Sequence, residues 1–198
     1  VVDPTAPPPG AKDFSDYFLR CRENLADPRA VEYLQKSGIS VTTAFDYMIG
    51  FDPEADPNGS GYKRPRMICP SGPSLFMGRA IYDDCPEQYK KQNAAGSKAA
   101  IFNAEALFDP NATEVFVTEG VFDALSLIEA GCNAIALNSA KNWTLLRTIL
   151  DYNAKHKNRK PRATLVLSLD NDRIGEEARD QRETALKTLH IAYSVQNV

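Results

Sequence analysis

Strand-like and helix-like segments alternate through the second half of this chain, and this alternation restricts the fold more than any other feature of the sequence. Short apolar runs occupy residues 114–118, 134–137, 164–169 and 191–195. Segments with apolar residues at helical spacing lie between them, at residues 121–130, 143–154 and 174–189. Strands that are joined through crossover helices run parallel. The pattern therefore predicts an α/β fold in which helices flank a parallel sheet of about four strands.

The first half of the chain predicts a smaller, mixed α+β unit. A helix is expected at 28–36, because Asp27-Pro28 is a typical helix start, and a second helix at 41–48. The apolar runs at 66–69 and 75–81 are separated by turn-forming residues and predict an antiparallel hairpin.

Loops and a tail are predicted around these elements. Turn-forming residues at 52–64 predict a mobile loop, and the polar stretch at 89–100 predicts irregular structure. The proline-rich N-terminus predicts a flexible tail. We divide the chain into a tail at 1–12, an N-terminal α+β subdomain at 13–111 and a parallel-sheet domain at 112–198, which we expect to be truncated at its C-terminus.

Composition excludes several classes of protein. Hydrophobic residues make up 43% and charged residues 25% of the 198 residues, as in soluble globular proteins. No apolar run approaches the length of a transmembrane helix, and the N-terminus lacks the pattern of a signal peptide. The 4 cysteines and 2 histidines lack the spacing of a structural zinc site. The scattered cysteines fit a reducing compartment better than a disulfide-bonded protein. We therefore expect a cytoplasmic protein that has no membrane partner.

Charge is distributed unevenly along the chain. Residues 61–98 carry seven Lys and Arg residues against three acids, and residues 140–162 carry seven against one. Residues 112–139 hold four acids and no base. Basic segments on either side of an acidic one suit a polyanion that is held near a metal site. Solvent-exposed loops and helix faces are the alternative explanation of the same pattern.

Acidic residues follow two of the predicted parallel strands. Glu119 comes directly after the first strand and Asp123 one helical turn later, whereas Asp170 ends the third strand and precedes Asp172 by two positions. Because the carboxyl ends of parallel strands open on one edge of a sheet, we expect these carboxylates to lie close together. Crowded carboxylates favour a bound cation, and their oxygens suit Mg²⁺ or Mn²⁺. Alternatively, these acids only stabilise helix N-termini.

Two motifs in this half resemble the signatures of the Toprim domain. They are Glu119-Gly-Val-Phe-Asp123-Ala-Leu and Asp170-Asn-Asp172-Arg-Ile-Gly175. The Toprim domain occurs in bacterial (DnaG-type) primases, in type IA and type II topoisomerases, and in some nucleases and recombination proteins. The resemblance covers about residues 112–198 and implies a Rossmann-like sheet with flanking helices.

Segments upstream of these motifs resemble the polymerase core of DnaG-type primases, and topoisomerases and Toprim nucleases lack them. They are Tyr33 to Ser40, Ile49 to Phe51, Arg66 to Pro70, Gly78-Arg79, Lys90 to Asn93 and Ile101 to Phe108. This sequence departs from the primase pattern at Asn171 and Asn138, where glycine is usual, and at Lys91, where tyrosine is usual. The variant motifs suggest a primase from a phage or another mobile element.

The primase resemblance implies template-directed synthesis of short RNA primers on single-stranded DNA from NTPs, by metal-dependent nucleotidyl transfer. The residues implied as metal ligands are Asp123, Asp170, Asp172 and Glu119, the last with general base as an alternative role. The residues implied in binding triphosphate or template are Arg79, Lys90 and Lys91, with Asn93 bonding a base or sugar. Two Mg²⁺ or Mn²⁺ ions are the implied cofactors, and a replicative helicase is a partner expected to bind outside this fragment.

Two other classes of function stay open. One is a Toprim hydrolase that cuts a phosphodiester with water, as in nucleases and topoisomerases. The other is a nucleic-acid-binding module with an inert Toprim fold. The upstream segments favour the primase over the hydrolase, and the four acids argue against an inert module. Primases use a further acidic pair after the fourth strand, so the activity of this fragment alone also stays open.

Overall fold

The computed structural model divides the chain into two compact units, which we describe separately. The N-terminal unit is Pro7–Ala100, and the C-terminal unit is Ile101–Val198 together with Val1–Ala6. The described residues are 3–7, 9–95, 100–139, 142–169 and 175–196, with the backbone alone described at 175–181.

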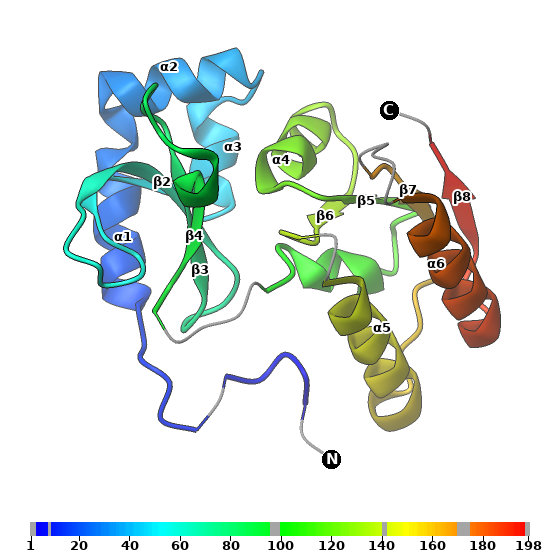
Figure 1. Ribbon diagram of the computed structural model, residues 1–198. Coiled ribbons are helices and arrows are strands. Elements are labelled where there is room, and N and C mark those ends of the chain that lie inside the picture. Colours follow the sequence, from blue (N-terminus) through cyan, green and yellow to red (C-terminus); the bar gives the residue numbers. More distant parts are fainter. Residues whose placement is uncertain (1–2, 8, 96–99, 140–141, 170–174, 197–198) are drawn as a thin grey trace. The chain divides into compact units, whose positions relative to one another are not determined.

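The C-terminal unit contains the predicted parallel sheet of four strands, in the order β6-β5-β7-β8 (Figure 1). The strands are β5 (Glu114–Thr118), β6 (Ala134–Ala136), β7 (Thr164–Leu167) and β8 (Tyr193–Val195). The helices are α4 (Val121–Glu129), α5 (Trp143–Tyr152) and α6 (Gly175–Leu189), with a 3-10 turn at Ala104–Phe108 and a π turn at Asn153–Lys157. All three strand pairings are parallel, which confirms the expected α/β fold.

The core of this unit lies between the sheet and the helices α5 and α6. Val115 and Val117 point to one face of β5 because side chains alternate along a strand, and both are fully buried. Leu146 of α5 and Leu186 of α6 belong to the same buried cluster. Figure 1 shows α4 on the other side of the sheet. Gly131 follows α4 with a φ of +87°, the left-handed conformation that commonly ends a helix.

The boundary between the two units lies further upstream than the predicted division at 111/112. The division after Ala100 leaves residues 101–111 with the C-terminal unit. Phe102 pairs with Ala136 in an isolated antiparallel bridge, and Leu107 is buried in the core described above. These contacts, which the local sequence does not indicate, attach the segment to the parallel sheet.

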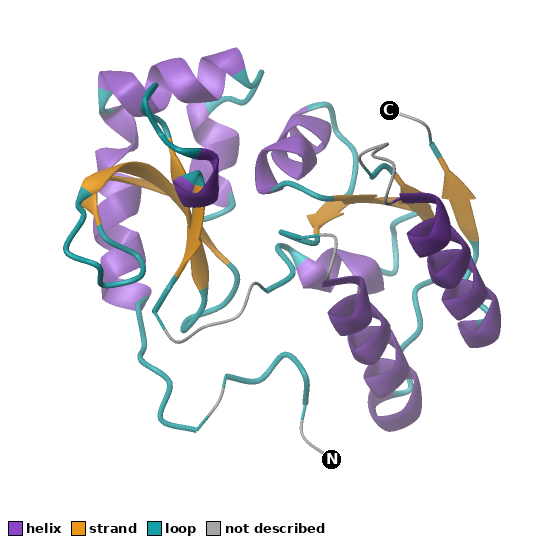
Figure 2. Ribbon diagram, in the orientation of Figure 1, coloured by secondary structure: helices purple, strands orange, loops and turns teal. Residues whose placement is uncertain are grey.

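The N-terminal unit contains an antiparallel sheet in the order β1-β2-β3-β4 (Figure 2). The strands are β1 (Gly50–Ala55), β2 (Arg64–Pro70), β3 (Phe76–Ala80) and β4 (Lys91–Asn93). The helices are α1 (Ser15–Glu23), α2 (Pro28–Lys36) and α3 (Val41–Asp46), with 3-10 turns at Asn24–Ala26 and Glu87–Tyr89. The predicted hairpin is confirmed by the pairing of β2 with β3. On one face of the sheet, Ile68 and Phe76 share a buried cluster with Phe18 and Cys21 of α1.

Two predicted loops contain strands. The expected loop at 52–64 is wrong for residues 52–55 and 64, because Asp52 pairs with Arg66 and Ala55 with Arg64 across a β-bulge. β1 is an edge strand, and an edge tolerates proline and turn-forming residues. The expected irregular stretch at 89–100 is wrong for residues 91–93, which form β4 at the other edge. Pairing with a neighbouring strand overrides weak local propensity in both cases.

The predicted tail has one specific contact in its described part. The Asp3 carboxylate lies 2.8 Å from Lys157 Nζ, within the C-terminal unit. No described helix is long and apolar enough to cross a membrane.

Candidate functional site

Glu119 and Asp123 lie at the carboxyl end of β5, in the C-terminal unit. Glu119 directly follows the strand and is half-buried, whereas Asp123 is exposed in the first turn of α4. The Oγ1 atom of Thr118 lies 3.0 Å from the carbonyl oxygen of Gly120 and 3.1 Å from that of Ile135. This hydroxyl therefore holds the turn that carries both acids against β6.

The Asp123 carboxylate folds back over the backbone of Gly120. A Cβ atom at position 120 would overlap Asp123 Oδ2, so this approach requires glycine. The carboxylate lies at the N-terminus of α4, where the helix dipole favours a negative charge. Glu119 and Asp123 thus supply hard oxygen donors on one tight turn, and such donors suit Mg²⁺ or Mn²⁺.

Strand pairing places the end of β7 beside the end of β5. Val117 pairs with Leu167, and the Ser168 amide donates to the Val117 carbonyl at 3.0 Å. The described chain continues to Leu169, and the predicted ligands Asp170 and Asp172 lie outside the described residues. Among the residues that the structure describes, no three His, Cys, Asp or Glu side chains form a group that could hold a metal ion. A four-carboxylate cluster thus stays a prediction.

The loop after β6 accounts for one departure from the primase pattern. Asn138 adopts a φ of +62°, in the left-handed region where glycine is favoured. Asparagine is among the residues that best tolerate this conformation. The side chain of Asn142 donates to the Leu137 carbonyl at 2.6 Å, which stabilises the same loop. Asn138 can therefore replace a glycine without altering the loop.

A basic face is formed in the N-terminal unit by β3 and β4. Arg79 pairs directly with Lys91, and Met77 pairs with Asn93. Residues directly opposite on antiparallel strands point to the same face, and so do alternate residues of one strand. Arg79, Lys91 and Asn93 therefore share one face of the sheet. We call this set the basic face.

Lys90 differs from the other predicted cationic residues. It precedes β4, and its Nζ atom lies 2.5 Å from a carboxylate oxygen of Glu87. The hydrogen bond from Lys90 lowers the pKa of the Glu87 carboxyl, and the positive charges of the basic face lower this pKa further. Within the described parts of the chain, neither Arg79 nor Lys91 forms an ion pair.

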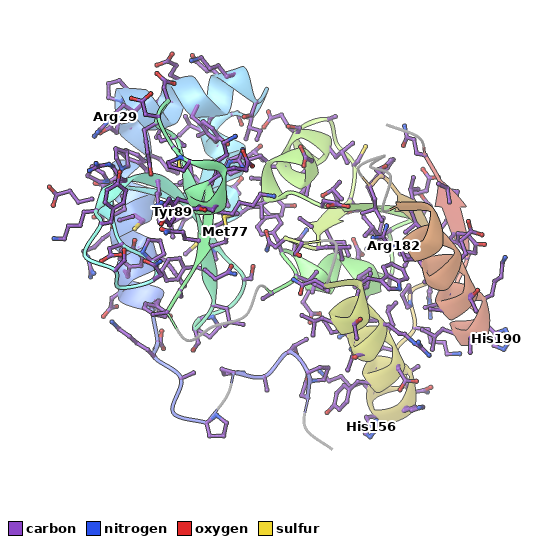
Figure 3. The ribbon with its side chains drawn as sticks, viewed as in Figure 1. Arg29, Met77, Tyr89, His156, Arg182 and His190 are labelled. Atoms are coloured by element: carbon purple, nitrogen blue, oxygen red, sulfur yellow. The ribbon has the colours of Figure 1, made fainter. Side chains whose placement is uncertain are left out.

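Arg66 is a buried residue to which the sequence pattern assigns no role beyond a strand. Its Nη1 atom donates to the carbonyl oxygens of Gly78 and Tyr89, at 3.2 Å and 2.9 Å. Tyr89, labelled in Figure 3, belongs to the short turn before Lys90. One feature of the sequence could have identified Arg66 as buried. It lies two residues before Ile68 on the same strand and therefore on the same face, and Ile68 belongs to the buried core.

Both histidines follow helices of the C-terminal unit. His156 and His190 are exposed, and Figure 3 shows them at the far ends of α5 and α6.

The comparisons with known proteins agree with the geometry. Residues 116–197 match the family model described as Toprim-like. The zinc-binding and RNA polymerase domains of Aquifex aeolicus primase match with 20% identity and a TM-score of 0.67, over 93% of this chain and 53% of that one. A DnaG primase catalytic domain bound to single-stranded DNA matches with 21% identity and a TM-score of 0.63, over 93% of this chain and 69% of that one.

A third match is the E. coli primase catalytic core, with 20% identity and a TM-score of 0.61, over 93% of this chain and 71% of that one. The chain spans about half the length of the Aquifex aeolicus structure. No curated protein sequence matches this chain. Residues 116–197 therefore form a Toprim-like domain, and the chain has the fold of the DnaG-type primase catalytic core.

Proposed function

We propose that this chain is the catalytic core region of a DNA primase that makes short RNA primers on single-stranded DNA. The observation that carries the proposal is the placement of Glu119 and Asp123 at the carboxyl end of a Toprim strand, in a chain with the primase-core fold. The basic face of the N-terminal unit supports it, because a polymerase needs cations for its template and triphosphate.

The proposed reaction joins the 3′ hydroxyl of a ribonucleotide to the α-phosphate of an incoming NTP and releases pyrophosphate. The hydroxyl must lose a proton, and the charge that develops on the phosphate must be neutralised. We assign Glu119, Asp123, Asp170 and Asp172 to hold Mg²⁺ or Mn²⁺. When bound, two divalent ions would act as Lewis acids that neutralise phosphate charge and lower the pKa of the 3′ hydroxyl. Glu119 has the alternative role of accepting the proton from the hydroxyl.

The basic face would bind phosphates. The guanidinium of Arg79 is suited to bidentate contact with a phosphate, and Lys91 beside it adds a point charge. Asn93 carries both donors and acceptors and would bond a base or a sugar. Lys90 is a weaker candidate because Glu87 already neutralises its charge. Phosphate contacts position a strand without reading its sequence, so we expect template binding here to be sequence-independent.

Two alternatives predict different products. A Toprim hydrolase would use the same carboxylates to activate water against a phosphodiester, and a binding module would use only the basic face. The primase is favoured because the N-terminal antiparallel unit, which the primase cores share, accompanies the Toprim-like domain. A replicative helicase would be a partner of the full protein.

The test is incubation of the protein with single-stranded DNA, labelled NTPs and Mn²⁺. Short labelled RNA that disappears in Glu119→Gln supports the primase, because this variant keeps the side-chain shape and removes the charge. Shortened DNA in place of RNA supports the hydrolase. DNA binding with neither product supports the binding module and contradicts the proposal.

A further inference from the structure

Arg66 is a buried cation in the N-terminal unit whose hydrogen bonds converge on the basic face. It has 0% exposure, and no ion pair with a described residue includes it. The carboxylate directly opposite, that of Asp52 on β1, accepts instead from the hydroxyl of Tyr17 at 2.8 Å. Burial of a guanidinium without a carboxylate is costly. The contacts that this side chain does make therefore need an explanation.

The side chain of Arg66 crosses β3 at a glycine. A Cβ atom at Gly78 would lie 3.1 Å from Arg66 Cδ, so the absence of a side chain there lets the stem of Arg66 pass. Beyond this point Nη1 donates to the carbonyl oxygens of Gly78 and Tyr89, at 3.2 Å and 2.9 Å. Nε and Nη2 form no hydrogen bond with the described residues. The hydrogen bonding of this guanidinium is therefore concentrated on the two carbonyls.

The two carbonyls belong to the segments that carry the predicted cationic residues. Gly78 immediately precedes Arg79, and Tyr89 immediately precedes Lys90 and then Lys91. The amide of Ala80 donates to the Lys90 carbonyl at 2.9 Å and adds one further link between the two segments. Arg66 thus ties the segment before β4 to β3, from the face of the sheet opposite to the basic face.

β4 needs such a tie. It has 3 residues and lies at the edge of the sheet. Its Lys91 stands directly opposite Arg79, and like charges in directly opposite positions destabilise a strand pair. A short edge strand with this repulsion would separate readily from β3.

We propose that Arg66 is a positioning residue that holds β4 against β3 and thereby keeps Arg79 and Lys91 together as one phosphate-binding face. The inference rests on the proposed function, in which this face binds nucleic acid or triphosphate. The competing explanation is that Arg66 only fills volume in the core. In that case an unbranched apolar side chain of similar size would keep the same stability and the same binding.

The test compares Arg66→Met with Ile68→Val in the full chain. Ile68 is two residues away on the same strand and face, is fully buried, and has no side-chain donor for the Tyr89 carbonyl, so its variant controls for a general decrease in stability. Two quantities are measured, each corrected for the free energy of unfolding from urea titration. The first is hydrogen exchange at the Ala80 amide, and the second is affinity for a fluorescent single-stranded oligonucleotide over a range of salt concentrations.

We expect Arg66→Met to accelerate exchange at Ala80 about tenfold more than Ile68→Val, the factor expected for removing one hydrogen bond to a charged group. We also expect weaker oligonucleotide binding, with a salt slope lower by about 0.7 for each phosphate that the face no longer neutralises. Arg66→Lys keeps the charge on a single nitrogen, and it should protect Ala80 better than Arg66→Met. It also serves as the test variant should Arg66→Met fail to fold.

Equal exchange at Ala80 in the arginine variants and Ile68→Val would overturn the proposal, because no tie would exist. Faster exchange with binding no weaker than in Ile68→Val would overturn it as well, because the tie would not position the face. Absence of oligonucleotide binding in the wild type would instead contradict the proposed function. The exchange comparison would then still decide whether Arg66 holds β4.

Discussion

Arg79 and Lys91 lie directly opposite each other on the antiparallel strands β3 and β4. Two like charges in this position cost the fold a few tenths to about 1 kcal/mol. The nearby carboxylate of Glu87 forms its ion pair with Lys90 and not with either member of the opposite pair. An arrangement that costs stability and concentrates positive charge is suited to a bound anion, which would remove the repulsion.

Replacement of Lys91 by alanine should therefore separate stability from binding. We expect Lys91→Ala to unfold at an unchanged or slightly higher urea concentration, because the repulsion with Arg79 is removed. Affinity for single-stranded DNA should fall, and the slope of its salt dependence should decrease by about 0.7. Fluorescence anisotropy at several salt concentrations measures both.

Lys90→Ala is the matched control, because the side chain of Lys90 is already paired with Glu87. Its salt slope should change less than that of Lys91→Ala. Equal changes in the two variants would show that the ion pair does not distinguish the lysines. If both variants bind DNA with the wild-type affinity and slope, neither lysine contacts DNA and both side chains are only solvated.

Gly120→Ala tests the position of the Asp123 carboxylate. The new Cβ atom would displace Asp123 Oδ2, and the conformation of Gly120, with a φ of −105°, is accessible to alanine. We expect the free energy of unfolding to change by less than about 1 kcal/mol. Binding of Mn²⁺, measured by calorimetry, should weaken by about tenfold because the carboxylate is no longer held in its position beside the metal.

Gly131→Ala gives the opposite pattern and is the control. Gly131 has a φ of +87° at the end of α4, so alanine there should lower the free energy of unfolding by about 1 kcal/mol. Mn²⁺ binding should be unchanged. Unaltered Mn²⁺ affinity in Gly120→Ala would mean that the Asp123 carboxylate does not contribute to metal binding.

The sequence predicts the parallel sheet well because its strands are buried and its helices are amphipathic. Val115 and Val117 belong to a short apolar run, which is typical of a strand in the buried interior of a parallel sheet, and both are fully buried. The acids could be proposed as candidate ligands from the same pattern, because a predicted strand also predicts which residues follow its carboxyl end. The family model and the fold comparisons confirm the Toprim-like domain and the primase-like fold.

The basic face could be predicted only in part. Arg79 lies in a recognisable strand, but Lys91 lies in a polar stretch whose pairing depends on β3. The sequence pattern places Arg66 in a strand, yet its contacts with Gly78 and Tyr89 depend on where the segment before β4 passes. Long-range contacts of this kind are absent from local composition and periodicity.

Asp170 and Asp172 lie outside the described residues, and their role as metal ligands is testable in solution. We expect weak Mn²⁺ binding to the wild-type chain, because such ions usually need substrate phosphates to complete their coordination. The double variant Asp170→Asn, Asp172→Asn should abolish it. Asp151→Asn, which alters an acid of α5 that is paired with Lys155, should leave Mn²⁺ binding intact. Unchanged binding in the double variant would refute the assignment.

Cys69 on β2 makes the stability of the chain depend on pH in the alkaline range. Burial raises the pKa of its thiol from 9.0 to about 12, and the positive charges of Arg79 and Lys91 oppose the shift. Between these values the unfolded chain releases a proton that the folded chain retains. The contribution of Cys69 is therefore fully present below pH 9 and is lost as the pH rises toward 12.

The expected decrease is about 1.4 kcal/mol for each pH unit in this window. Urea unfolding at pH steps above neutrality measures it, with Cys69→Ala as the reference that lacks the titrating group. Below the window the two proteins should differ by a constant amount, which is the cost of the cavity. Above pH 9 the difference should shrink in favour of Cys69→Ala. Curves that stay parallel through this window would show that the Cys69 thiol ionises without penalty, and that the sheet beneath Arg79 and Lys91 is accessible to water.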